Sequence, residues 1–340
     1  MSANDWIWIT EADVVSTLDI GDAIRAVRAG FADEARGDAQ NMVKTHTAWD
    51  GSTLHAIGAA FPRVGLVGTK TWSHTAGGAT PLLLLFDAAN GELVAIAEAF
   101  ALGQLRTASV SGVATDLLAV PGAAQLAMIG TGKQALAQVA AIRAVRPIQQ
   151  VRVHGRDEAR RKAFALRVEQ SLGVEAVPAA SVAEAVDGAD VITLATRATE
   201  PVLTSSMVAP GAHINALGAI TKERQEFEPE LLERCGVIGA DSVPQVRRLS
   251  LEFSRYFDEG GRDWDRVQPL SSLLEELGGR PGDADLTLTK AMGTGVCDLA
   301  VGIACYQAMR DNGLGSPRDQ PSPIEPRLRA RTGVAGVGYV

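Results

Sequence analysis

A glycine-rich turn between a short apolar run and an alanine-rich segment constrains this chain more than any other feature. Residues 126–129 are apolar and favour a strand, whereas residues 133–146 carry apolar side chains at helical spacing as far as Pro147. The turn between them reads Gly130, Thr131, Gly132, Lys133, Gln134, Ala135. The sequence therefore predicts a strand, a tight turn and a helix in direct succession.

Such a unit can bind the pyrophosphate of a dinucleotide. Gly130 permits the bend, Gly132 lets the backbone approach the pyrophosphate, and small Ala135 lets the helix pack closely on the strand. The amides at the helix start then face the anion. A phosphate loop of the NTPase type is the alternative, but it needs Gly in place of Ala127 and Ser or Thr in place of Gln134. The residues expected to bind the cofactor here are Gly130, Thr131, Gly132, Gln134 and Ala135.

Size and charge exclude several classes of protein. A chain of 340 residues can form two domains, and 46% hydrophobic with 21% charged residues is typical of a soluble α/β enzyme. The net charge of −8 argues against a nucleic-acid or membrane partner. The three cysteines form no CxxC pair, which favours a reduced, cytoplasmic location and predicts no metal site. We find neither a signal peptide nor a membrane span in the sequence.

The first third of the chain predicts a mixed sheet closed by helices. Helices are expected from Thr10, over residues 20–31 and over residues 101–119. Asn90 and Gly91 are typical of a hairpin turn. Four strand-like runs lie at residues 54–59, 64–72, 81–87 and 92–97.

The rest of the chain alternates strands and helices, which predicts a parallel sheet covered on both faces. Pro121 and Gly122 mark the domain boundary. We interpret residues 249–261 as an irregular excursion and residues 288–310 as a long apolar helix, interrupted near Gly293, that returns to the first domain. The tail after Gly313 is expected to be an arm or partly disordered. Further strands are expected at residues 150–154, 174–178, 190–196, 212–217 and 237–241, with helices at 157–172 and 181–186.

Several segments, taken together, resemble the ornithine cyclodeaminase and mu-crystallin family of NAD(P)-dependent enzymes. They occur in the order typical of that family, from about residue 10 to residue 310. The resemblance implies an α/β fold with a Rossmann doubly wound parallel sheet over residues 121–299. It also implies an α+β substrate-binding and dimerisation domain formed by residues 1–120 and 300–340. The matching segments are residues 68–70, 85–92, 105–111, 130–135, 210–218 and 290–293, with Asp298.

The resemblance also implies a chemistry, hydride exchange between a nicotinamide and the α-carbon of an amino or imino acid. Arg106 matches the family residue that clamps the substrate carboxylate through its planar fork. Lys70 matches the lysine at the reacting centre, as a carboxylate contact or a proton donor, and Lys44 stands as a second basic contact. Thr196 and Asp298 are expected at the cofactor, although Asp298 could instead complete a polar network. Without the matched flanks, the arginine and the lysines would be read as ordinary solvated groups.

One departure from the family concerns the reaction. Cyclodeaminases and alanine dehydrogenases carry an Asp where this chain has Ile220, after Gly218 and Ala219. An isoleucine can neither accept a proton nor bind ammonium, unless Thr221 or Glu226 substitutes for it. We therefore favour a reductase acting on an imine that is already formed. An ammonia-eliminating cyclodeaminase and a protein that mainly binds NADPH and a small ligand remain the alternatives.

The end of the second expected strand bears on the cofactor. NAD-specific sites place an acidic residue there, whereas a nearby Arg accommodates NADP. Here Gly155 is followed by Arg156 and Asp157, so NADP is favoured and NAD stays possible. His213, beside a strand expected to be buried, is interpreted as structural, while Trp72 and His74 could line the pocket. The predicted protein is a homodimeric NAD(P)H-dependent imine reductase or amino-acid dehydrogenase acting on a small imino or amino acid, or on a 2-oxo acid plus an amine.

Overall fold

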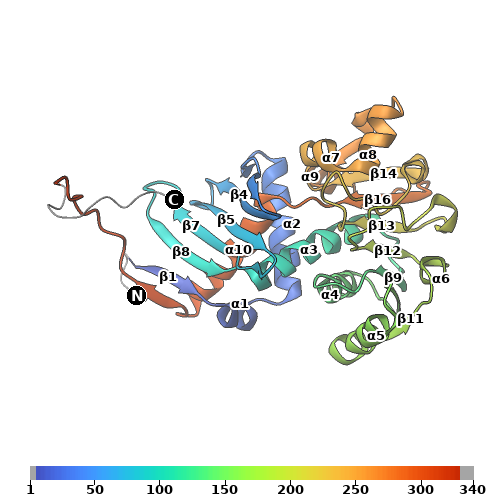
Figure 1. Cartoon of the computed structure of the whole chain (residues 1–340), viewed down its shortest axis with the longest axis horizontal. Helices are drawn as coiled ribbons and strands as arrows, with labels where there is room; N and C mark the ends of the chain where they lie inside the picture. The colour runs from blue at the N-terminus through green and yellow to red at the C-terminus, as the bar shows by residue number, and fades with distance from the viewer. Residues whose placement is uncertain (1–4, 330–340) are drawn as a thin grey trace.

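The structure, a computed structural model, describes residues 5–329 and places them in two halves, each built on its own sheet (Figure 1). Helix α3 (Phe100–Leu118) lies between the halves and leads from one sheet to the other. Within residues 5–329, no helix is both long and apolar enough to cross a membrane. The predicted fold class, an α/β chain with a parallel dinucleotide-type sheet and a mixed second sheet, is confirmed.

The first sheet is mixed, with strand order β17-β1-β8-β7-β5-β4-β2, while β3 pairs with β4 and β6 with β5. The four expected strands are present in it. Between β7 and β8 the carboxylate of Asp87 accepts hydrogen bonds from the amides of Ala89 and Asn90, and Gly91 takes φ +76°. This confirms the predicted hairpin turn. The strands are β1 (Trp6–Ile9), β2 (Gln40–Asn41), β3 (Thr45–Trp49), β4 (Ser52–Phe61), β5 (Leu66–Thr75), β6 (Gly78–Ala79), β7 (Leu82–Asp87), β8 (Leu93–Glu98) and β17 (Ser316–Arg318).

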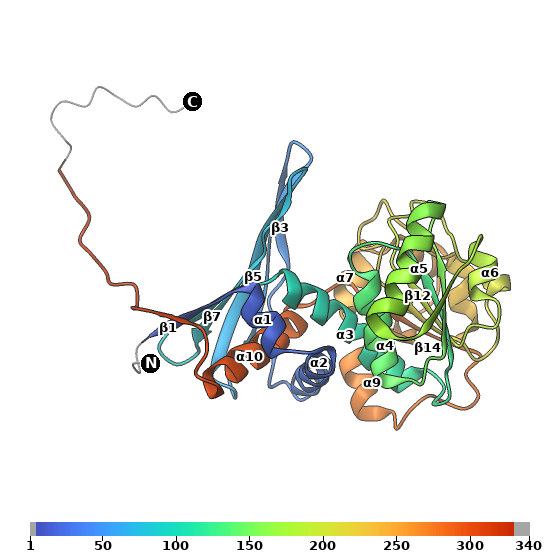
Figure 2. The same ribbon diagram turned by 90° about the horizontal axis from the view of Figure 1, so that it is seen from below.

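Helices α1 (Glu11–Thr17) and α10 (Gly295–Asp311) pack on this sheet, and α2 (Ile20–Ala35) packs on α10 (Figure 2). Both N-terminal helices begin with a capping box, at Thr10 and Asp19, as expected for the first. Glycines permit the close packing of α10. A Cβ on Gly30 would lie 2.9 Å from that of Ala300, and one on Gly302 would lie 2.7 Å from the side chain of Leu83.

The second sheet is parallel throughout, with strand order β11-β10-β9-β12-β13-β16-β14-β15. The order reverses between β9 and β12, where the first crossover turns back, so ligands are expected beyond the carboxyl ends of these two strands. Its strands are β9 (Gln125–Ile129), β10 (Gln150–His154), β11 (Glu175–Pro178), β12 (Val191–Leu194), β13 (His213–Ala216), β14 (Cys235–Ala240), β15 (Val267–Pro269) and β16 (Leu286–Lys290). Its helices are α4 (Ala135–Val145), α5 (Glu158–Leu172), α6 (Val182–Val186), α7 (Val243–Leu249), α8 (Leu251–Ser254) and α9 (Leu270–Glu276), with short turns η1 (Ser205–Met207), η2 (Pro229–Arg234), η3 (Arg255–Glu259) and η4 (Trp264–Arg266).

Two sequence expectations were wrong in this half. Residues 249–261, expected to be an irregular excursion, are largely helical. Their short turns, one of them a π-turn, bury aromatic side chains against the core. The spacing of these side chains has no regular helical period, so the sequence pattern did not indicate a helix. Residues 288–310 are not one helix either. Their first part belongs to β16, whose five residues are all buried, and a strand buried on both faces shows the same continuous apolar pattern as a buried helix. Gly293, at φ +89°, then turns the chain into α10.

Helix α10 also bears on the domain division. It begins at Gly295, so a boundary at residue 299 would cut through it. Because α10 packs on α2 and β7, we propose to draw the second boundary before Gly295. The first boundary, at residue 121, falls in the connection between α3 and β9. Residues 330–340, assigned above to the terminal arm, lie outside the described residues.

Candidate active site

Three elements of the first half bring charged side chains together. Lys70 comes from β5, Arg106 from α3 and Asp298 from α10. Asp298 Oδ1 accepts a hydrogen bond from Lys70 Nζ and a second, of 2.9 Å, from Arg106 Nε. The exposed fractions of the three side chains are 6%, 15% and 2% in that order. We call these residues and nearby Lys44 the cavity cluster.

The cavity cluster carries more positive than negative charge. Lys70 and Arg106 pair with the carboxylate of Asp298, whose Oδ2 is buried without a hydrogen-bond partner among the described residues. Lys44 lies within the electrostatic reach of Arg106, Asp241 and Asp298. Burial lowers the pKa of Lys44, and the charge of Arg106 lowers it further. Buried cations in excess of their counter-charges favour an incoming anion. The site is therefore suited to a substrate carboxylate.

The protonation of Lys70 reflects opposing influences. Burial lowers its pKa to about 8, against the attraction of Asp298, which favours the charged form. Burial would raise the pKa of Asp298, but Arg106 and Lys70 outweigh it and hold that pKa below its usual range. At neutral pH the structure thus presents an ionised carboxylate beside a lysine that can release its proton, as a general acid requires.

Asp241, a residue that the sequence analysis did not single out, holds the turn that packs against the guanidinium of Arg106. The carboxylate of Asp241, at the end of β14, accepts hydrogen bonds from the amides of Met292 (2.8 Å) and Gly293 (2.7 Å). A Cβ on Gly293 would lie 3.0 Å from Arg106 Nη1, so the bare glycine backbone packs against the guanidinium. Only the position of Asp241 at a strand end could have signalled this role.

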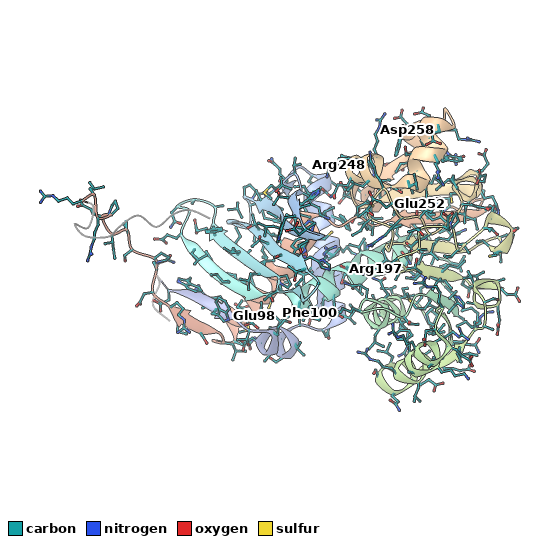
Figure 3. The ribbon with its side chains drawn as sticks, viewed as in Figure 1. Glu98, Phe100, Arg197, Arg248, Glu252 and Asp258 are labelled. Atoms are coloured by element: carbon teal, nitrogen blue, oxygen red, sulfur yellow. The ribbon has the colours of Figure 1, made fainter. Side chains whose placement is uncertain are left out.

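A cavity of about 200 Å³ opens beside Lys70 and Arg106 and reaches the glycine turn of the other half, at Lys133 and Gln134. The expected wall residue Trp72 lines it, whereas His74 is exposed and does not. Lys70 Nζ lies 5.1 Å from the centre of the Trp72 ring. Figure 3 labels Phe100, another wall residue, at the start of α3, and Arg197 across from it on the second half. The remaining lining residues are Ala79, Pro81, Ala99, Gly103, Gln104 and Thr107.

The glycine turn has the geometry that a pyrophosphate needs. Gly130 takes φ +114°, and a Cβ there would lie 2.5 Å from the carbonyl oxygen of Ala195. A Cβ on Gly132 would meet no protein atom, so the bare backbone faces open space. Helix α4 begins at Ala135 without a side-chain cap from the described chain, although the amide of Ala135 itself donates to the carbonyl of Gly132 at 3.1 Å. The start of a helix favours a bound anion. Gln134 Oε1 is buried without a partner within residues 5–329. These features fit a bound dinucleotide.

The end of β10 lies beside this turn. A Cβ on Gly155 would lie 3.0 Å from the side chain of Thr131, so the two segments touch. Arg156 is exposed and makes no hydrogen bond or ion pair with any described residue. Asp157 is engaged instead as the N-cap of α5, where it accepts from the amide of Arg160 at 2.8 Å. The unpaired guanidinium of Arg156 and the engaged carboxylate of Asp157 are the two groups here that could distinguish NADP from NAD.

Comparison with known families decides the assignment. Residues 7–313 match the profile of the ornithine cyclodeaminase/mu-crystallin family. The chain belongs to this family. The resemblance found in the sequence is thereby confirmed.

Individual members of the family show how similar the chain is to them. It is 31% identical to a Delta(1)-pyrroline-2-carboxylate reductase of Bacillus cereus, over 69% of this chain and 72% of the relative. It is 35% identical to the ketimine reductase mu-crystallin of Mus musculus, over 66% and 68%. Among solved structures, an archaeal alanine dehydrogenase dimer with bound NAD superposes with a TM-score of 0.85 at 26% identity, covering 93% of this chain and 99% of that one.

The departure from the family pattern at Ile220 is not compensated by either neighbour named above. Ile220 is half-buried and packs against the core of the second half. Glu226 is fully buried, and each of its carboxylate oxygens already accepts two hydrogen bonds. Thr221 has no charge to offer an ammonium group. Neither Thr221 nor Glu226 therefore takes the place of the family aspartate.

His213 occupies a structural position, as expected. Its ring nitrogens lie 3.0 Å from Thr287 Oγ1 and 3.2 Å from Asn215 Oδ1. Burial lowers the pKa of His213 to about 3, so the ring is neutral at physiological pH. It is fully buried within the second half, on β13, and does not line the cavity.

Proposed function

We propose that this chain reduces the C=N bond of a small imino acid with a reduced nicotinamide dinucleotide and, in reverse, oxidises the corresponding amino acid. One observation carries the proposal: a single cavity is lined both by Lys70 and Arg106 and by Lys133 and Gln134 of the glycine turn. The class of enzyme predicted from the sequence is confirmed by the relatives, whose names describe a pyrroline-2-carboxylate reductase and a ketimine reductase.

The residues of the cavity cluster take separate roles in this reaction. Arg106 binds the substrate carboxylate through its planar fork, and Lys44 adds a second positive charge. Lys70 donates a proton to the imine nitrogen and becomes neutral, which its lowered pKa permits. Asp298 holds Lys70 and Arg106 side by side, and its contact with the cofactor remains a prediction. The nicotinamide, when bound, supplies the hydride to the carbon of the C=N bond.

The cofactor is held at the glycine turn and the strand ends beside it. The amides of the turn and of the α4 N-terminus bind the pyrophosphate. We propose NADPH as the favoured cofactor, with NADH possible, because Arg156 is exposed and unpaired in the described chain while Asp157 caps α5. The cofactor-binding residues of this proposal are Gly130, Thr131, Gly132, Gln134, Ala135, Arg156 and Thr196.

We also propose a cytoplasmic homodimer. Strand β3 is exposed along its whole length, and its hairpin projects from the body of the first half (Figure 2). Large apolar side chains are exposed on and around it, which is typical of an association surface. The archaeal alanine dehydrogenase of similar fold is a dimer. All three cysteines are buried free thiols, which supports a reducing compartment. The exposed apolar residues are Met42, Val43, Trp49 and Leu54.

The proposed function is tested by a spectrophotometric screen of NADPH and NADH oxidation. The substrates are cyclic imines such as pyrroline-2-carboxylate, and 2-oxo acids mixed with ammonia or methylamine. We expect steady turnover of at least one imino acid, faster with NADPH. Ammonia release from ornithine with catalytic cofactor would favour the cyclodeaminase instead. NADPH binding without turnover of any imine would contradict the proposal and favour a binding protein.

A further inference from the structure

A buried carboxylate joins the ends of two neighbouring strands in the second half. Glu226 Oε1 accepts hydrogen bonds from Thr196 N (2.6 Å) and Thr196 Oγ1 (2.8 Å). Its Oε2 accepts from Gly218 N (2.7 Å) and Ala219 N (3.0 Å). Thr196 follows β12 and Gly218 follows β13, so four donors from two strand ends converge on one side chain.

These strand ends border the place where the strand order reverses. A Cβ on Gly130 would lie 3.5 Å from Thr196 Cγ2, so Thr196 stands between the glycine turn and Glu226. A Cβ on Gly218 would overlap the backbone of Thr196 and lie 2.5 Å from Glu226 Oε1. The loops after β12 and β13 are therefore tightly packed at Thr196 and Gly218, and the carboxylate of Glu226 contacts both of them.

Further buried charges hold Glu226 itself. Glu252 Oε1 accepts from Glu226 N at 2.9 Å, and Glu252 Oε2 accepts from Ser250 Oγ at 2.7 Å. Lys290 Nζ lies 3.5 Å from Glu252 Oε1. We call Glu226, Glu252 and Lys290 the interior cluster; all three are fully buried. Figure 3 shows Glu252 within the second half. Buried charges are costly and weak evidence for stability, so such a network calls for another role, such as fixing one conformation.

We propose that Glu226 is a positioning residue that fixes the nicotinamide end of the cofactor crevice without touching the substrate. The inference rests on the proposed function, in which the pyrophosphate binds at the glycine turn. A dinucleotide spans the crevice at the reversal point. Its adenosine half lies on the β10 side, near Gly155 and Arg156. The half beyond β12 and β13, where Glu226 holds Thr196 and Gly218, is then the nicotinamide half.

The test compares a whole cofactor with half of it. Glu226→Gln keeps the size of the side chain but can no longer accept from both pairs of donors. We expect the dissociation constant of NADPH to rise about tenfold, as for the loss of one hydrogen bond to a charged group. The dissociation constant of 2′,5′-ADP, which lacks the nicotinamide half, stays within about twofold, since its contacts are unchanged. Calorimetry measures both, and NADPH fluorescence reports the nicotinamide environment.

Glu228→Gln is the matched control, because Glu228 belongs to the same segment and its Oε1 also accepts from a backbone amide, that of Ser205 at 2.5 Å. This variant keeps wild-type affinity for both ligands. If Glu226→Gln does not fold, Glu226→Asp keeps the charge with a shorter reach and shows the same selective loss. Equal loss of NADPH and 2′,5′-ADP, or no loss of either, would overturn the inference. Failure of the wild type to bind either NADPH or NADH would instead contradict the proposed function.

Discussion

The molecule contains two groups of buried charges, and they differ in how completely the hydrogen bonds of their central carboxylates, Asp298 and Glu226, are satisfied. In the cavity cluster Lys70 and Arg106 both pair with Asp298, one of whose carboxylate oxygens has no hydrogen-bond partner in residues 5–329. In the interior cluster both oxygens of Glu226 are saturated by four donors. Lys70 and Arg106 of the first group line a cavity. In the second group the carboxylate of Glu226 holds backbone amides in place, while Lys290 Nζ has no hydrogen-bond partner among the described residues and lies 3.5 Å from Glu252 Oε1. Buried charge beside a cavity therefore identifies the reactive site better than buried charge alone.

The largest effect is expected at Arg106. Arg106→Ala removes the fork that binds the substrate carboxylate, and kcat/KM for the imine should fall about 10³-fold. Arg106→Lys is the control, since it keeps the charge but not the two parallel N–H donors, and it should recover only part of the loss. Steady-state kinetics measures both. If Arg106→Ala keeps near wild-type kcat/KM, the cavity cluster is not the carboxylate site.

Glu252→Gln tests the interior cluster. It leaves Lys290 without its buried counter-charge, and the free energy of unfolding should fall by about 3 kcal/mol. Urea denaturation measures the change. Glu158→Gln, which breaks the exposed pair of Glu158 with Lys162, should hardly alter stability. Equal small effects in the two variants would show that the interior cluster does not hold the fold.

The pH dependence of the reaction tests Lys70. Its pKa is lowered to about 8, so Lys70 is protonated below that pH and loses its proton above it. As the proton donor it must be charged, and kcat/KM for imine reduction should fall about tenfold per pH unit above the inflection. Oxidation of the amino acid needs neutral Lys70 and should rise through the same range. A Lys70→Arg variant that retained the inflection would assign it to another group.

The smallest effect concerns the choice of cofactor. Arg156→Ala should raise the Michaelis constant for NADPH about tenfold, because the 2′-phosphate loses its cation, and leave that for NADH nearly unchanged. The ratio of the two constants is the measurement. A matched variant, Arg160→Ala in the first turn of α5, should leave the ratio unaltered. Parallel rises for NADH and NADPH with Arg156→Ala would contradict the NADPH preference.

Local pattern predicted much of this fold. The strand, glycine turn and helix at residues 126–146 and the hairpin at Asn90 and Gly91 were correct because turn chemistry and apolar period both act within a few residues. Residues 288–290 were wrongly predicted as helix, because a strand buried on both faces has no distinguishing period. The short helices at 251–259 were not predicted for a related reason, because a single π-turn disrupts the spacing of the buried side chains.

The site residues were predictable only through the family resemblance of the segments around them. Lys70, Arg106 and Asp298 were named from the resemblance, but their convergence depends on β5, α3 and α10, which are far apart in sequence. Asp241 and the saturation of Glu226 could not have been inferred, because their partners are backbone amides supplied by the tertiary fold.

The central claim is that the glycine turn presents the nicotinamide to Lys70 and Arg106 in one cavity. A crystal structure with NADPH and a bound amino acid such as L-proline tests it most directly. The account predicts pyrophosphate density at Gly132 and the start of α4, the nicotinamide beside Lys70, and the amino-acid carboxylate on the guanidinium of Arg106. A cofactor bound elsewhere, or a carboxylate turned away from Arg106, would contradict it.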